Sequence, residues 1–126
     1  MTRTFQANVR PREADDRSLP PGLERARALF EARIEEQVLR IEQCRRDVKA
    51  GRAPGRALSE IAGHAHKIAG VAGTVGHPRL GELAGRVETL IGQARSEGLS
   101  EMAILKGLHH DLEQMLDALE AALLDG

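Results

Sequence analysis

The stretch that decides the fold is residues 65–76, which read Ala65-His66-Lys67-Ile68-Ala69-Gly70-Val71-Ala72-Gly73-Thr74-Val75-Gly76. Apolar residues recur through this stretch, and just before it, at alternating separations of three and four residues: Leu58, Ile61, Ala65, Ile68, Ala72 and Val75. Such spacing keeps one stripe of a helix facing the interior of a folded domain. The stretch is therefore predicted to be the second half of an amphipathic helix.

His66 lies outside that stripe. At about 100° per residue it is roughly 130° from the centre of the stripe, so its side chain is expected to point to solvent or to the helix flank. The residues that share its face within two turns are all small: Ser59, Ala62, Gly63, Ala69, Gly70 and Gly73. A glycine in an exposed helix costs about 1 kcal/mol relative to alanine. We therefore predict that these six residues form a docking face for a partner of His66, although Gly63 and Gly73 could instead permit close helix packing.

These residues resemble the histidine-containing phosphotransfer (HPt) domain family of two-component phosphorelays. The likeness rests on a pattern that starts at the histidine and continues into the next helix: His66, Ile68, Gly70, Ala72 and Gly76, with Lys67 a common choice at its position, then Leu80, Leu83, Ala84 and Glu88. The resemblance implies that His66 accepts a phosphoryl group. It also implies receiver domains of response regulators, and a sensor histidine kinase, as partners. Magnesium is then expected on the partner receiver domain, and no cofactor in this chain.

If His66 is a phosphoacceptor, the chain needs few other catalytic groups. A neutral imidazole is itself a nucleophile, and the sequence has no ATP-binding or kinase motif, which suits a phosphocarrier rather than a true enzyme. Lys67 is a candidate for stabilising the charge of the moving phosphoryl group. The family usually has a basic residue where this chain has Ala69. That departure keeps a second function open, an adaptor that binds a receiver or kinase without passing phosphate.

A metal-binding helical bundle is a third function to weigh, because the chain has five histidines: His64, His66, His77, His109 and His110. Ligands on one helix converge on a metal when they are three or four residues apart, or when they face each other across helices. Two of these histidines are two residues apart and two are adjacent, which is a poor spacing for ligands. No metal site is predicted.

The remaining chain reads as three further helices and an arm. Residues 1–18 mix charged residues and proline without a sustained period, which indicates an N-terminal arm before a single domain, residues 19–126. The expected helices run from Ser18–Pro21 to about Ala50, from about Arg56 to Val75, from Pro78 to a break at Ser96, and onward from a cap at Ser100. Four amphipathic helices with short connections predict an all-α, antiparallel up-down-up-down four-helix bundle, the fold that the family resemblance also implies.

Composition limits the partners and the compartment. The net charge is −1, and the chain has two phenylalanines and no tyrosine or tryptophan, so neither an electrostatic field nor a stacking platform for nucleic acid is expected. The single cysteine, Cys44, excludes an intrachain disulfide and is expected to be a small buried hydrophobe in a reducing compartment. With no membrane span and no signal peptide pattern, we expect a cytoplasmic protein. The initial Met and a chain that ends soon after the fourth predicted helix favour a free-standing protein. The family resemblance implies that dimeric members use extra helices, and none is predicted here, so a monomer is expected.

Overall fold

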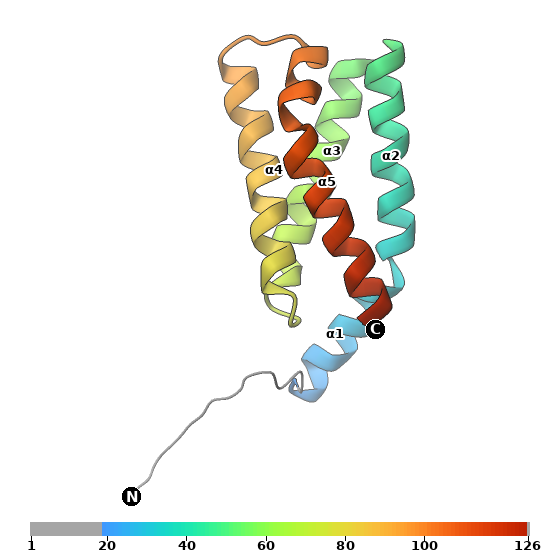
Figure 1. The fold of residues 1–126 in the computed structure, drawn as a ribbon. Helices are drawn as coiled ribbons and strands as arrows, with labels where there is room; N and C mark the ends of the chain where they lie inside the picture. The colour runs from blue at the N-terminus through green and yellow to red at the C-terminus, as the bar shows by residue number, and fades with distance from the viewer. Residues whose placement is uncertain (1–18, 126) are drawn as a thin grey trace, which may run out of the picture.

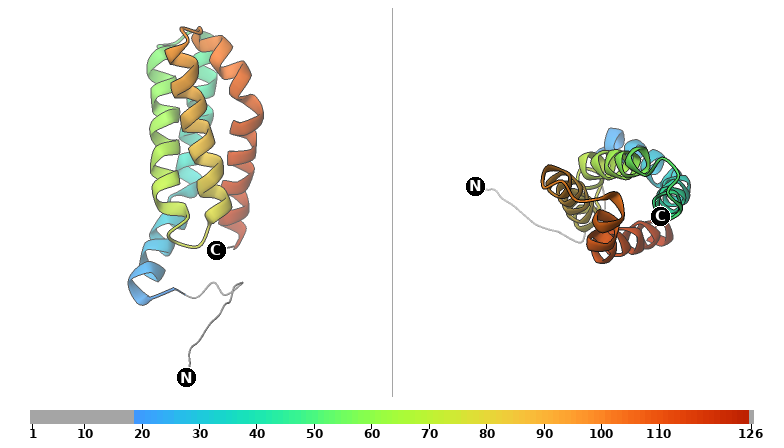
Figure 2. Two further views of the ribbon diagram at one scale, coloured as in Figure 1. Left: turned by 90° about the vertical axis from the view of Figure 1, so that its left-hand side faces the viewer. Right: turned by 90° about the horizontal axis from the view of Figure 1, so that it is seen from above.

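The computed structural model describes residues 19–125, so the predicted N-terminal arm, residues 1–18, lies outside the described residues, as does Gly126. The described residues contain helices and no strand, which confirms the all-α prediction: α1 (Pro21–Ala32), α2 (Ile34–Ala50), α3 (Pro54–Ala72), α4 (Pro78–Ser96) and α5 (Glu101–Asp125). Helices α2 to α5 lie side by side, each running opposite to the one before it, and α1 lies at the end of the molecule where α5 finishes (Figure 1). Seen from above, α2 to α5 surround a common core (Figure 2).

The expectation of one long first helix is wrong. The chain between residues 21 and 50 forms two helices separated at Arg33, so the described part of the chain has five helices rather than four. The backbone of Arg33 has φ −103° and ψ −2°, and its N–H donates to the carbonyl of Phe30 at 3.1 Å. The apolar stripe passes straight through this break, because Phe30 and Ile34 are both buried on either side of it. Since neither glycine nor proline marks Arg33, periodicity could not reveal the break.

Helix α3 buries the stripe that the sequence predicts. All six stripe residues are buried, including Val75, which lies in the turn beyond the end of the helix. They belong to one core cluster with large buried side chains of the neighbouring helices, among them Ile41, Ile91, Leu112 and Met115. Burying an aliphatic side chain of this size contributes about 1.5–3 kcal/mol to folding, so the contacts of α3 at the centre of the core hold the opposite face of the helix in a defined orientation.

Two local predictions are confirmed. The Ser100 hydroxyl accepts a hydrogen bond from the Ala103 N–H at 3.2 Å and so caps α5. Cys44 is 4% exposed, and burial, helped by a hydrogen bond to Glu60, raises the pKa of its thiol to about 11. The thiol therefore stays protonated at neutral pH and serves as a buried apolar group. None of the helices within residues 19–125 has a stretch long and apolar enough to span a bilayer.

Helix α4 lies very close to the backbone of residues 69–73 at Gly81. A Cβ atom at this position would lie 3.3 Å from the backbone nitrogen of Gly73 and 3.7 Å from the carbonyl oxygen of Ala69. A larger residue would therefore have to displace the backbone of α3. The absence of a side chain at Gly81 lets α4 lie directly against the His66 helix.

This contact predicts opposite effects for two glycine substitutions in α4. Gly81→Val should lower the free energy of unfolding by about 1–3 kcal/mol, because the added methyl groups overpack a backbone contact. Gly85→Ala should raise it by about 0.5–1 kcal/mol, because glycine is a poor helix former and a Cβ there meets nothing within 4 Å. Urea unfolding followed by circular dichroism measures both. Equal effects of the two substitutions would contradict the close contact between Gly81 and the backbone of residues 69–73.

Candidate functional site

The His66 side chain projects from α3 and is 74% exposed, as its place outside the stripe predicts. Its Nδ1 atom lies 2.9 Å from Oε2 of Glu88 on α4. A carboxylate only accepts hydrogen bonds, so the ring must donate from Nδ1. This assigns the proton of the neutral ring to Nδ1 and leaves the lone pair on Nε2, the atom that can act as a nucleophile or ligand.

Glu88 therefore orients the imidazole and selects its tautomer. The sequence pattern includes Glu88, but assigns it no role at the site, because it stands 22 residues from His66 on a different helix. Within α4 it directly follows a buried residue, Val87, and it is 40% exposed. Only the packing of α4 against α3 brings the carboxylate to the ring.

The surface around His66 on α3 is bare. Gly63, Gly70 and Gly73 are exposed, and a Cβ atom added at any of the three would meet nothing within 4 Å. Close helix packing therefore does not explain the missing side chains at Gly63 and Gly73; the glycine that permits close packing is Gly81. The space above the three glycines is open to a partner.

The other predicted docking residues lie at the edges of this bare surface. Ala62 and Ala69 are half-buried and pack against the core. Ser59 is exposed, and its hydroxyl accepts a hydrogen bond at 3.0 Å from Arg95 of α4, which also donates to the carbonyl of Gly55 at 2.7 Å. The sequence analysis did not include Arg95. This residue lies two helical turns beyond Glu88 on α4 and places a positive charge beside Ser59.

A sequence model of the Hpt domain matches residues 25–122, which is most of the chain. The chain belongs to the Hpt domain family. The domains of this family act in histidine phosphotransfer within phosphorelays and interact with receiver domains and kinases. No curated protein and no solved structure matches the chain.

Lys67 and Ala69 occupy opposite flanks of His66 in this Hpt domain. Lys67 is exposed and lies about 100° around α3 from His66, on the side away from α4, and it has no ion-pair partner within residues 19–125. Ala69 lies on the α4 side, half-buried, with its carbonyl beside Gly81. The family usually has a basic residue at the position of Ala69. Lys67 therefore puts its positive charge on the other side of His66 from the position where the family usually has one.

The histidines of the Hpt domain make separate contacts. His109 contacts Arg45 and His77 contacts Glu31. His64 is half-buried, and burial, with the nearby charge of Lys67, lowers its pKa. Residues 19–125 bring no group of three or more histidine, cysteine or acidic side chains close enough to hold a metal ion.

Proposed function

We propose that this Hpt domain accepts a phosphoryl group on Nε2 of His66 from the phospho-aspartate of one receiver domain, or from a kinase, and passes it to the aspartate of another receiver. The observation that carries the proposal is the hydrogen bond between Nδ1 and Glu88. It leaves Nε2 as the nucleophilic atom of a highly exposed ring, on a surface without side chains at Gly63, Gly70 and Gly73.

The chemistry follows from this arrangement. The Nε2 lone pair attacks phosphorus, a P–N bond forms, and the P–O bond to the donor aspartate breaks, so that the aspartate leaves as a carboxylate. The ring gains positive charge in this step while Nδ1 keeps its proton, and the Glu88 carboxylate, 2.9 Å away, stabilises that charge. The reverse step on a second receiver returns the lone pair to Nε2. By the family pattern, magnesium would be held by the receiver domain, where it would stabilise the charge of the phosphoryl group.

The bare surface serves docking in this proposal. A receiver must bring its aspartate and the loops around it to within bonding distance of Nε2, which side chains on the same face would prevent. Gly63, Gly70 and Gly73 supply the open area, and Ser59, Ala62 and Ala69 border it. Lys67, on the far flank, is the candidate for contacting the phosphoryl group through its long side chain.

The test is to incubate the protein with a panel of radiophosphorylated receiver domains and histidine kinases from the same organism. Acid-labile, base-stable label on the protein supports the proposal and identifies the partner. Receiver binding without any label would instead favour the adaptor function. That alternative rests on Ala69, which stands where the family usually has a basic residue. Size-exclusion chromatography with light scattering tests the further expectation that the domain acts as a monomer.

Glu88 provides a separate prediction. Glu88→Ala should slow single-turnover phosphorylation of His66 by about 10- to 100-fold, the equivalent of one charge-assisted hydrogen bond of about 1.5–3 kcal/mol. Glu88→Gln keeps a carbonyl oxygen that can accept from Nδ1 and should lose less. Glu82→Ala is the matched control, an exposed acid of α4 whose contact is with Arg79. An unchanged rate in Glu88→Ala would contradict the assigned role.

A further inference from the structure

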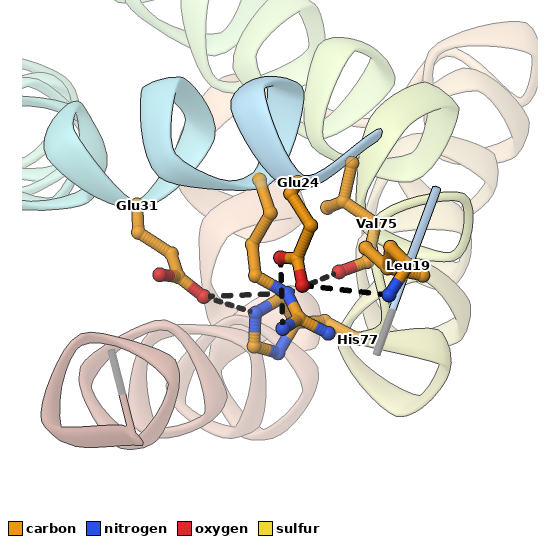
Figure 3. A network of polar contacts seen from close by, with 6 residues as sticks. Leu19, Glu24, Glu31, Val75 and His77 are labelled. Atoms are coloured by element: carbon orange, nitrogen blue, oxygen red, sulfur yellow. Dashed lines mark hydrogen bonds and ion pairs between the residues drawn. The ribbon is translucent and has the colours of Figure 1, made fainter. Parts of the chain in front are cut away.

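Helix α1 is held to the bundle largely by polar contacts. Phe30 is the one apolar residue of α1 that is buried. The Arg27 Nε–H donates to the carbonyl of Val75 at 2.9 Å, and Glu31 Oε2 lies 2.9 Å from Nε2 of His77. Figure 3 shows Glu31 and His77 meeting between α1 and the turn that joins α3 to α4. We call Arg27, Glu31 and His77 the α1 clamp.

The side chains of the α1 clamp are close to fully buried and depend on one another. They are 12%, 15% and 8% exposed for Arg27, Glu31 and His77. The Glu31 carboxylate lies between the other two groups, 4.0 Å from Arg27 Nε and 2.9 Å from His77. The Arg27 guanidinium covers Gly76, whose φ of +98° and missing side chain leave the room it occupies. These contacts connect α1 to the turn between α3 and α4.

The short covalent connection between α1 and α2 does not by itself set the direction of α1, and we infer that the α1 clamp sets it. One residue, Arg33, separates α1 from α2. The Phe30 ring lies 5.9 Å from the His77 ring, centroid to centroid, so the buried apolar residue of α1 also contacts a clamp residue. The other contacts of α1 with the core are apolar and come from Phe30 and the partly buried Ala26.

The position of α1 shapes a groove beside His66. The groove has a volume of about 370 Å³ and lies between α3 and the α1–α2 junction; it is lined by Ala26, Leu29, Phe30, Arg33, Gln37, Lys67 and Val71. Its α1 wall comes from the same two turns as Arg27 and Glu31. Its α3 wall begins at Lys67, the residue after His66. The groove therefore opens on the flank of His66 that faces away from α4.

The lining of the groove includes exposed apolar side chains and polar groups that have no partner within residues 19–125. Leu29 and Val71 are 56% and 40% exposed. The Oε1 atom of Gln37 is buried and has no hydrogen-bond partner among the described residues. Arg33 and Lys67 have no acidic partner within residues 19–125. Such a groove is complementary to apolar side chains accompanied by a hydrogen-bond donor and a carboxylate.

We propose that the α1 clamp presets this groove for the receiver domain, so that Arg27, Glu31 and His77 are positioning residues that determine receiver affinity without taking part in the transfer step. The inference rests on the proposed function, because it requires a receiver that docks at His66 and also reaches the groove, whose lining includes the adjacent residue Lys67. Holding the α1 wall in place before binding removes an ordering cost that the complex would otherwise bear. The receiver surface that fits is apolar with an acidic residue facing Arg33 and Lys67.

The experiment measures the dissociation constant of each fluorescently labelled receiver domain of the panel for the protein in a His66→Ala background, where no transfer occurs. Glu31→Ala should weaken the binding by about tenfold, because the α1 wall is no longer fixed. Glu31→Gln keeps an acceptor for His77 and should stay within about threefold of the parent. Glu35→Ala, an exposed acid of α2 with no ion pair within residues 19–125, is the matched control and should bind normally.

A kinetic measurement separates positioning from chemistry. With His66 present, Glu31→Ala should raise KM for the phosphorylated receiver by the same factor and leave kcat unchanged, since no residue of the α1 clamp contacts His66. A lower kcat at unchanged KM would overturn the proposal. So would unchanged dissociation constants in Glu31→Ala, or the absence of binding by every receiver.

A second variant keeps the proposal open to refutation if Glu31→Ala fails to fold. Val71→Asp alters the groove while the α1 clamp stays intact, and Leu39→Asp places the same charge at a 64% exposed leucine outside the groove. Weaker binding in Val71→Asp alone supports the groove, and equal binding in both overturns it. Clamp-dependent binding without transfer would refute the proposed function only. Transfer with clamp-independent binding would refute this inference only.

Discussion

Replacing His66 by alanine should remove phosphoryl acceptance from every donor, by more than about a thousandfold, as expected when the nucleophile of a covalent step is lost. The fold should survive, because the side chain is 74% exposed and its one hydrogen bond in the described structure is to a partly exposed glutamate. The measurement is the amount of acid-labile label after a fixed time, normalised to protein, with helicity checked by circular dichroism.

Other histidines of the chain supply the matched controls. His64 stands two residues away on α3 and is half-buried, and His110 is exposed on α5. Alanine at either position should leave the label at the level of the unaltered protein. Label that persists in His66→Ala, or that disappears in His64→Ala with the fold intact, would move the phosphoacceptor away from His66.

The second large effect is expected from Gly70→Glu, which should reduce receiver binding and transfer by about a hundredfold. Position 70 is one turn from His66, so the new side chain places bulk and negative charge where the phosphoryl group must sit. Folding should be unaffected or slightly improved, because a Cβ there meets nothing within 4 Å and glutamate favours a helix over glycine by about 0.5–1 kcal/mol.

Gly107→Glu is the control for this substitution. Gly107 lies inside α5, and a Cβ at this position also meets nothing within 4 Å. It therefore gains the same charge and helix propensity on a different helix. A receiver pull-down with circular dichroism compares the two variants. Retained binding in Gly70→Glu, or loss of its helicity, would count against a docking face at His66.

The faces of α3 could be predicted because helical periodicity is a property of the backbone and needs no knowledge of neighbours. The same six residues that the spacing selects are buried, and His66 is exposed on the other side. The cap at Ser100 is likewise local, since the serine and the amide that it binds are three residues apart. The pattern from His66 into the next helix was also sufficient to indicate the family that the match over residues 25–122 shows.

The break at Arg33 could not be predicted from the same kind of signal. The apolar stripe continues through it, and no local turn residue marks it. Helix α1, which precedes the break, contacts the turn between α3 and α4, where Glu31 meets His77, 46 residues away in the sequence. Periodicity depends only on residues close together in the sequence and takes no account of such a distant contact. It therefore predicted one long helix where the chain forms two.

The sequence by itself determined the helical class, the buried stripe of α3 and the exposure of one histidine among small residues, because each depends on contacts within a few residues along one helix. Tertiary structure alone decided which atom of His66 is free, since the partner that occupies Nδ1, Glu88, comes from another helix. It also decided that Gly81, rather than Gly63 or Gly73, permits the close approach of α3 and α4. Both depend on the register between two helices, which is set by how the whole core packs.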